Sequence, residues 1–257
     1  MALSIWESLA VFAAGIGAGT INTIVGSGTL ITFPVLLSTG LPPVTATVSN
    51  ALGLIPGSVS GAIGYRAELK GQRPLVLRLG AIAATGGLCG AVLLLTLPAT
   101  AFETIVPVLV ALALVLVVLQ PRISARVQRR RERKGTVARA HGGPVLLGGI
   151  LLASVYGGYF TAAQGIIYLS LMGMLLTDSL QRLNAVKNVL AAIVNTIAAL
   201  FFLFVAHFDW TAVVLIAVGS AIGGQIGAKV GRRLPPFALR IFIVVVGSFA
   251  IVQLLLR

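Results

Sequence analysis

Long apolar runs separated by short polar stretches dominate this chain, and several of them are long enough to cross a membrane as helices. About 18–20 consecutive apolar residues are needed to span roughly 30 Å of hydrocarbon. The pattern predicts broken segments at 8–40 and 145–177, and helices at 44–65, 74–96, 101–120, 180–206, 211–230 and 237–256. We therefore predict an all-α polytopic membrane protein.

Glycine and hydroxyl residues interrupt the two broken segments. The first contains "VGSGTLITFPVLL" at 25–37, and the second contains "YGGYFTAAQG" at 156–165. Each segment is too short for two full spans of about 20 residues. Non-helical backbone at membrane depth is tolerated only where it is buried in protein or lines a wet cavity. We predict that each segment is a broken or re-entrant hairpin, with non-helical residues at 26–29 and 163–165 that face each other near the middle of the membrane. The alternative is that the glycines serve only close helix packing.

The two halves of the chain show a weak internal repeat. Gly28 and Gly165 are 137 residues apart, and the glycine pairs 86–87 and 223–224 have the same offset. Such repeats are frequent in secondary transporters. The predicted organisation is an N-terminal transmembrane repeat (1–120), a basic cytoplasmic loop (121–144) and a C-terminal transmembrane repeat (145–257). Each repeat combines one broken segment with three transmembrane helices.

Basic residues predict the side of the membrane on which each connection lies. Eight of the 19 Lys and Arg residues fall in 121–144, which the positive-inside rule places in the cytoplasm. The connection at 66–73 is also basic, whereas "HFDW" at 207–210 carries an acid and no Lys or Arg. These positions predict that the two repeats have inverted topology and that both termini lie outside.

The composition excludes a soluble globular domain. Of the 257 residues, 58% are hydrophobic and only 10% are charged, with a mean hydropathy of +1.04; soluble domains carry about a quarter charged residues. The net charge of +13 is concentrated in the 121–144 loop, which favours the surface of a lipid bilayer over nucleic acid as the partner. Because Cys89 is the only cysteine, no internal disulfide and no cysteine-based metal site are expected.

Lys187 is the strongest candidate for chemistry, because it lies one or two turns inside the apolar helix 180–206. A lysine in hydrocarbon costs about 2.5–3.5 kcal/mol on insertion scales. No acid lies three or four residues away on its helix, so we expect an unpaired cation that faces a cavity and attracts an anion. The alternative is that Lys187 snorkels beside Arg182 to the cytoplasmic edge.

Other polar residues extend this predicted anion site. "VSNAL" at 48–52 matches "VKNVL" at 186–190, which pairs Ser49 and Asn50 with Lys187 and Asn188. Half-helix N-termini at the turns would add free N–H groups. The predicted substrate-binding residues are Asn22, Ser27, Gly28, Thr29, Ser49, Asn50, Thr161, Gln164, Gly165, Lys187 and Asn188. No P-loop, HExxH or serine nucleophile motif is found, so no catalytic residue, metal site or cofactor is predicted.

The stretch "AAGIGAGTINTIVGSGTLITFPVLLSTGLPPVTATVSNALGLIPGSVSGAIGYR" in the first half, with "GGYFTAAQGIIYLSLM" and "LNAVKNVLAAIVN" in the second, resembles a known family. This is the sulfite exporter TauE/SafE family, also called the toluene sulfonate uptake permease family. The resemblance covers about 8–256 and includes the "GxGxxxxxPxL" turn and the basic loop. Many members have glycine or proline in the second turn, where this chain has Gln164 and Ser170.

The resemblance implies a multi-pass transporter of small sulfur-containing anions, such as sulfite or sulfonates, in the bacterial inner membrane. Export is favoured, because the negative cell interior drives one negative charge outward with about 2.3 kcal/mol per 100 mV, and no intramembrane carboxylate relay offers proton coupling. An anion-selective channel and a proton-coupled uptake permease remain alternatives. No enzymatic activity is expected. The sequence is also compatible with a homodimer.

Overall fold

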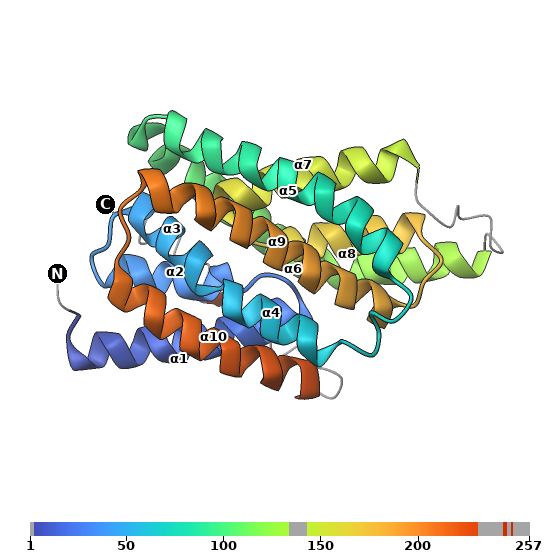
Figure 1. Cartoon of the computed structure of the whole chain (residues 1–257), viewed down its shortest axis with the longest axis horizontal. Coiled ribbons are helices and arrows are strands. Elements are labelled where there is room, and N and C mark those ends of the chain that lie inside the picture. The colour runs from blue at the N-terminus through green and yellow to red at the C-terminus, as the bar shows by residue number, and fades with distance from the viewer. Residues whose placement is uncertain (1–2, 134–142, 231–243, 246–247, 249–257) are drawn as a thin grey trace.

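The computed structural model describes residues 3–133, 143–230, 244–245 and 248. The helices in order are α1 (Ile5–Ile24), α2 (Thr29–Ser38), α3 (Pro43–Gly53), α4 (Ile55–Gly64), α5 (Arg73–Thr96), α6 (Ala99–Arg133), α7 (Pro144–Phe160), α8 (Gln164–Leu175), α9 (Leu180–Val205) and α10 (Trp210–Val230). They lie roughly along one long axis (Figure 1). Within α5, α6, α9 and α10 the described residues are long and apolar enough to cross a membrane. The predicted all-α polytopic membrane fold is confirmed, and the predicted helix 237–256 lies almost wholly outside the described residues.

Both interrupted segments form helical hairpins. The first turn separates α1 from α2 and contains Gly26 at φ +90°, a conformation that suits glycine. The second separates α7 from α8 and places Thr161 and Ala163 at φ 61° and 56°, which is rare for residues with a Cβ. The predicted break at 26–29 is confirmed for 26–28, whereas Thr29 already begins α2. The second break lies at 161–163 rather than 163–165, because Gln164 and Gly165 already belong to α8.

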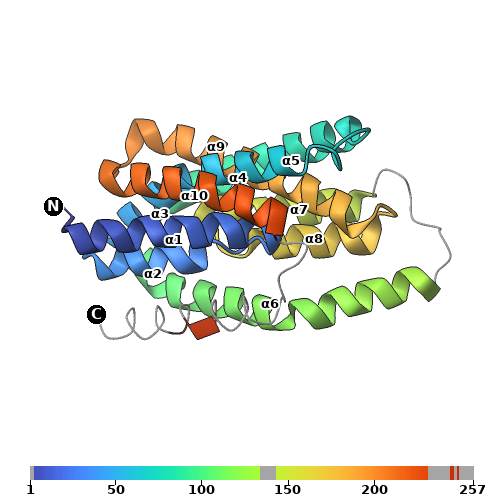
Figure 2. The same cartoon turned by 90° about the horizontal axis from the view of Figure 1, so that it is seen from below.

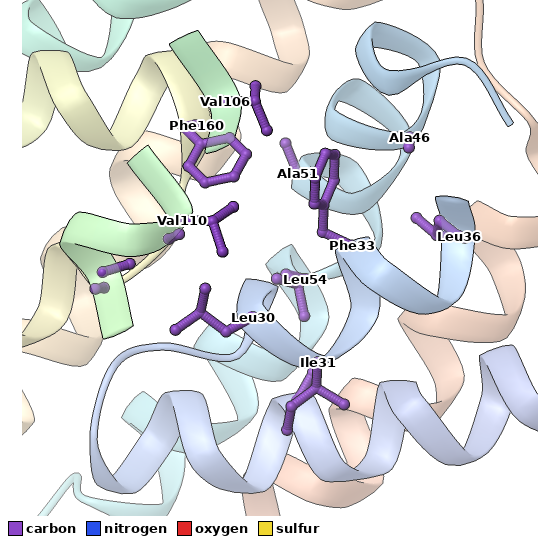
Figure 3. Close-up of a cluster of buried hydrophobic side chains, with 14 of the residues drawn as sticks. Leu30, Ile31, Phe33, Leu36, Ala46, Ala51, Leu54, Val106, Val110 and Phe160 are labelled. Carbon is purple, nitrogen blue, oxygen red and sulfur yellow. The ribbon is translucent and has the colours of Figure 1, made fainter. Parts of the chain in front are cut away.

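Helix α2 lies at the centre of the bundle. Leu30, Ile31, Phe33 and Leu36 are each at most 3% exposed, and they point in different directions in Figure 3. The ring of Phe33 meets Phe160 edge-on, with centroids 5.2 Å apart, and such pairs contribute about 0.5–1.5 kcal/mol beyond their buried area. A short helix that is apolar all round requires enclosure by other helices. The first hairpin turn is therefore buried in protein.

The first helix of each half of the chain packs against the other half. Helix α1 packs along α10, and α7 packs along α5. In the same way α4 lies against α10, and α9 lies against α5 (Figure 1). Since α5 and α10 hold equivalent places in the predicted repeats, the contacts of one half mirror those of the other. Two symmetry-related repeats would produce this pattern; their inverted topology itself stays a prediction.

Glycines paired by the 137-residue offset make equivalent contacts. A Cβ at Gly86 would lie 2.6 Å from a carbonyl oxygen of α7, and a Cβ at Gly223 would overlap the backbone of α1. The neighbouring Gly87 faces α9, and Gly224 faces α4, so each again contacts a helix of the other half. Small residues allow helix backbones in membranes to approach closely. These glycines therefore serve helix packing and not a turn.

Helix α6 continues well beyond its predicted end at residue 120. The beginning of the stretch predicted as a basic loop, 121–133, is helical, and Figure 2 shows α6 reaching past the neighbouring helices. Hydropathy falls at this point because arginines become frequent after residue 121. Arginine is a good helix former, however, so the loss of hydropathy does not end the helix.

The predicted helix 44–65 is divided into α3 and α4 at Leu54. Pro56 has no backbone N–H to donate to the carbonyl of Leu52, and its ring disfavours helical backbone in the residue before it. The chain continues after Leu54 in nearly the same direction, since Ser58 N–H donates to the carbonyl of Leu54 at 3.0 Å. The proline thus makes a local irregularity and not a separate span.

Basic and acidic connections lie at opposite ends of the bundle. The α4–α5 connection and the basic end of α6 are at one end, and the N-terminal part of α1 and the α9–α10 connection are at the other (Figure 1). The predicted orientation requires this arrangement. Which end faces the cytoplasm stays a prediction.

Candidate functional site

The turns of the two hairpins meet inside the bundle, as predicted. The backbone N–H of Gly165 donates to the carbonyl of Gly26 at 3.3 Å, and a Cβ at Gly26 would lie 2.5 Å from the Gly165 Cα. The hydroxyl oxygens of Thr29 and Thr161 are 3.0 Å apart. We call this region, residues 22–29 and 161–165 together with Lys187, the crossing.

Lys187 reaches the crossing from α9. Its side chain is fully buried, and Nζ donates hydrogen bonds to the carbonyl oxygens of Asn22 at 2.9 Å and Thr23 at 3.1 Å. These carbonyls end α1, whose last turn contains no basic residue. A cation at this place offsets the partial negative charge of a helix C-terminus. The snorkelling alternative is therefore wrong, and the expectation of an unpaired cation is corrected, because backbone carbonyls are its partners.

Two asparagines of α9 donate to the same helix end. The side-chain amides of Asn184 and Asn188 lie 3.2 Å and 3.4 Å from the Thr23 carbonyl oxygen, to which Lys187 also donates. Three donors thus surround one oxygen that has two lone pairs. They fasten the end of α1 to α9. Asn188 is one of the predicted substrate-binding residues, and Asn184, which is not among them, contacts the same carbonyl.

A chain of buried side-chain hydrogen bonds connects the second turn to α2 and α3. Asn50 Nδ2 donates to Thr29 Oγ1 at 3.1 Å, and Thr32 Oγ1 donates to Asn50 Oδ1. Through the Thr29–Thr161 contact the chain continues to the α7–α8 turn. Buried networks whose members are satisfied make a region rigid. The predicted residues Thr29, Asn50 and Thr161 therefore meet, with Thr32 as an additional member.

Two of the predicted residues place polar atoms without partners in the crossing. Ser27 Oγ and Gln164 Oε1 have no hydrogen-bond partner among the described residues, although both residues are at most 2% exposed. Gln164 Nε2 donates to Asn195 Oδ1 at 3.4 Å, and Asn22 Nδ2 donates to Ser58 Oγ at 3.1 Å. An unpaired buried polar group costs about 1–3 kcal/mol. The Ser27 hydroxyl is thus a hydrogen-bond donor without an acceptor in the described part of the chain.

Ser49 and Gly28 have other surroundings. Ser49 Oγ accepts from the backbone N–H of Asp209 at 3.0 Å, so the structure places Ser49 against the α9–α10 connection and not at the crossing. The repeat aligns Ser49 with Lys187 but does not bring them together. Gly28 precedes α2, and a Cβ there would lie 2.5 Å from the Ala18 carbonyl oxygen of α1. Gly28 therefore allows the two arms of the first hairpin to approach.

Helix ends and one side-chain charge determine the electrostatics of the crossing. Helices α1 and α7 end there, and α2 and α8 begin there. Helix termini carry roughly half an elementary charge each, positive at the start and negative at the end. The four ends nearly cancel. Lys187, the only buried charged side chain in the described part of the chain, remains as the net positive charge. Within the same residues no group of His, Cys, Asp and Glu could hold a metal ion.

Comparison with known proteins agrees with this membrane architecture. The model of the family described as "Sulfite exporter TauE/SafE" matches residues 11–254. The chain belongs to this family. As a member of the TauE/SafE family it is a multi-pass membrane transporter, and nothing in this membership points to catalysis.

Several curated bacterial relatives of this TauE/SafE protein are similar over most of their length. The "Probable membrane transporter protein YfcA" of Escherichia coli (strain K12) is 27% identical over 239 residues, which cover 93% of this chain and 86% of the relative. A "Probable membrane transporter protein" of Haemophilus influenzae is 26% identical over 222 residues, covering 85% of this chain and 82% of the relative. No solved structure matches the chain significantly.

Proposed function

We propose that this protein is a secondary transporter that exports small sulfur-containing anions, such as sulfite or sulfonates, across the bacterial inner membrane. The family description and the names of the relatives support transport. The observation that carries the proposal of an anionic substrate is the fully buried ammonium of Lys187 at the crossing. A buried charge inside a membrane protein is costly and marks an ion or substrate pathway.

The crossing offers an anion favourable interactions that replace the hydration it loses on leaving water. The ammonium of Lys187 supplies Coulomb attraction, which strengthens as the surroundings become less polar. The Ser27 hydroxyl has no hydrogen-bond partner among the residues that the structure describes. Helices α2 and α8 begin here with N–H groups of the kind that bind anions at helix N-termini. A small oxyanion with several acceptor oxygens can use these donors together. A neutral substrate would make no use of the Coulomb attraction of the Lys187 ammonium.

Substrate access requires one hairpin to move. Ser27, Gln164 and Lys187 are each at most 2% exposed, so the crossing is closed to solvent in this conformation. Contacts such as Gly165–Gly26 and Thr161–Thr29 hold the two hairpins together. We propose that these contacts separate on one side at a time while Lys187 keeps its position on α9. The two hairpins would then provide the alternating access of a carrier.

A transport assay with a substrate panel tests this proposal. Purified protein in proteoliposomes is offered labelled sulfite, organic sulfonates, sulfate and small carboxylates. We expect saturable flux of a sulfur-containing anion, together with counterflow driven by unlabelled substrate on the other side. Flux that does not saturate and shows no counterflow would favour the channel alternative. Uptake that needs an inward proton gradient would favour the proton-coupled permease.

A further inference from the structure

The C-terminal end of α1 has the chemistry of a site for a monovalent cation. It presents the carbonyl oxygens of Asn22 and Thr23 to one positively charged group, the ammonium of Lys187, at 2.9 Å and 3.1 Å. The carboxamide of Asn184 adjoins them, and its Oδ1 has no partner among the described residues. In transporters with discontinuous helices, half-helix C-termini and unwound carbonyls coordinate sodium ions or protons.

We propose that this helix end is a monovalent-cation site that Lys187 fills permanently with its own ammonium. The inference goes beyond the proposed function, and it rests on that function only for its consequence in transport. Lysine brings one positive charge, as a sodium or potassium ion would. Its N–H groups bind the carbonyl oxygens of Asn22 and Thr23, which such an ion would coordinate. In the part of the chain that the structure describes, the partners of the ammonium are backbone carbonyls, and no acid provides the counter-charge.

The covalent tether explains why a free cation would not be needed. A group attached to the same chain acts at an effective concentration that a dilute ion cannot match when the geometry fits. Lys187 is held by α9, whose Asn184 and Asn188 donate to the same Thr23 carbonyl. The built-in charge also stays with the protein during a transport cycle. The charge moved in each cycle is then that of the anion alone, and transport by the wild type is independent of sodium and potassium.

Shortening the side chain should convert the filled site into one that needs a free cation. Lys187→Ala leaves the carbonyls of Asn22 and Thr23 in place and creates room beside them, so an ion can enter. Lys187→Met is the matched control, because it fills the volume with an apolar chain. We expect both substitutions to lower the Tm by roughly 10 °C, since they leave a buried helix end without its counter-charge.

The measurement is the Tm of the purified full-length protein in sodium, potassium or N-methyl-D-glucamine chloride at equal ionic strength. We expect sodium or potassium to restore much of the lost Tm in Lys187→Ala, as mass action requires for an ion that binds only the folded state. Lys187→Met and the wild type should not respond. Absence of rescue in Lys187→Ala, or an equal rescue in Lys187→Met, would overturn the inference.

Two further measurements separate failure of this inference from failure of the proposed function. If Lys187→Ala is folded only when it is purified in sodium or potassium, exchange into N-methyl-D-glucamine should unfold it, and failure to fold in every salt counts against the site. Wild-type anion flux is measured in the same three salts. Sodium-dependent flux would overturn the inference while leaving anion transport standing. An absence of flux for every anion, with the rescue intact, would instead overturn the proposed function alone.

Discussion

Gly165 donates its backbone N–H to the carbonyl oxygen of Gly26, across 3.3 Å, where the two hairpins meet. The approach is so close that a Cβ on Gly26 would lie 2.5 Å from the Gly165 Cα, and one on Gly165 would lie 2.6 Å from the Gly26 Cα. Backbone fills both sides of this contact, so neither neighbour can move a flexible side chain away. The crossing therefore depends on the absence of two side chains.

The first prediction is that Gly26→Ala and Gly165→Ala each abolish transport and lower stability by several kcal/mol, as overpacking against backbone does. Two glycines provide matched controls, because a Cβ at Gly40 or Gly148 would meet no atom of the described residues within 4 Å. Gly40→Ala shares the positive φ of Gly26 and should cost only about 1 kcal/mol. Gly148→Ala should be silent. Thermal unfolding and flux check the series; normal transport by both crossing variants would show that the contact is dispensable.

The second prediction concerns Thr161, a β-branched residue held at φ 61°. Such a conformation is strained, and its hydroxyl contact with Thr29 across 3.0 Å gives a reason to keep it. Thr161→Gly should relieve the strain, so we expect it to be more stable than Thr161→Val, while both lose transport. Thr104→Val is the control, because Thr104 is exposed and bonds only to its own helix. Equal stability of the two Thr161 variants would argue against stored strain.

The third prediction is that Ser27→Ala weakens anion binding without loss of stability. A hydrogen bond to a charged group contributes about 1.5–3 kcal/mol, so we expect the KM to rise roughly ten-fold to hundred-fold. Stability should be unchanged or higher, because the buried hydroxyl has no partner in the described part of the chain. Ser170→Ala removes a hydroxyl that bonds only to the carbonyl of Ile166 in its own helix, and it should leave the KM unchanged. An unaltered KM in Ser27→Ala would remove Ser27 from the site.

The fourth prediction is that Ala67 and Ala125 lie on the cytoplasmic side and His207 lies outside. All three are exposed, and they lie in the α4–α5 connection, the basic part of α6 and the α9–α10 connection. Single cysteines at these positions, in a Cys89→Ser background, are labelled in intact cells with a membrane-impermeant thiol reagent. Only His207→Cys should react before the cells are opened. Labelling of His207→Cys and Ala125→Cys from the same side would contradict the inverted topology.

The sequence carries enough information for the helices and the first turn, since apolar runs and the glycines at 26 and 28 report both directly. The second turn lies at 161–163, two residues before its predicted place at 163–165. Thr161 and Ala163 adopt left-handed backbone there, and neither residue type signals such a turn, because contacts with the first hairpin impose it. The continuation of α6 to Arg133 was missed for a different reason, since hydropathy reports lipid contact and not helix formation.

The partners of Lys187 show the limit of searching a sequence for charge pairs. No acid lies near Lys187 on its own helix, and its partners are the backbone carbonyls of Asn22 and Thr23, about 165 residues away in the chain. Every residue has such a carbonyl, so no residue type reveals this contact. Sequence matching failed in the opposite way for Ser49, which aligns with Lys187 but bonds Asp209. Only the packing of the helices decides which residues meet.

The central claim is that the buried charge of Lys187 draws an anion into the crossing, and one flux experiment tests it most directly. Proteoliposomes containing wild type or Lys187→Gln are loaded with a transported anion, and efflux is recorded at imposed membrane potentials, with stability confirmed by thermal unfolding. We expect an inside-negative potential to accelerate wild-type efflux, in line with about 2.3 kcal/mol per charge per 100 mV. A folded Lys187→Gln protein should lose roughly ten-fold or more of this flux. Undiminished efflux in the folded variant would contradict the account, and wild-type efflux that ignores the potential but follows a pH gradient would replace it with proton coupling.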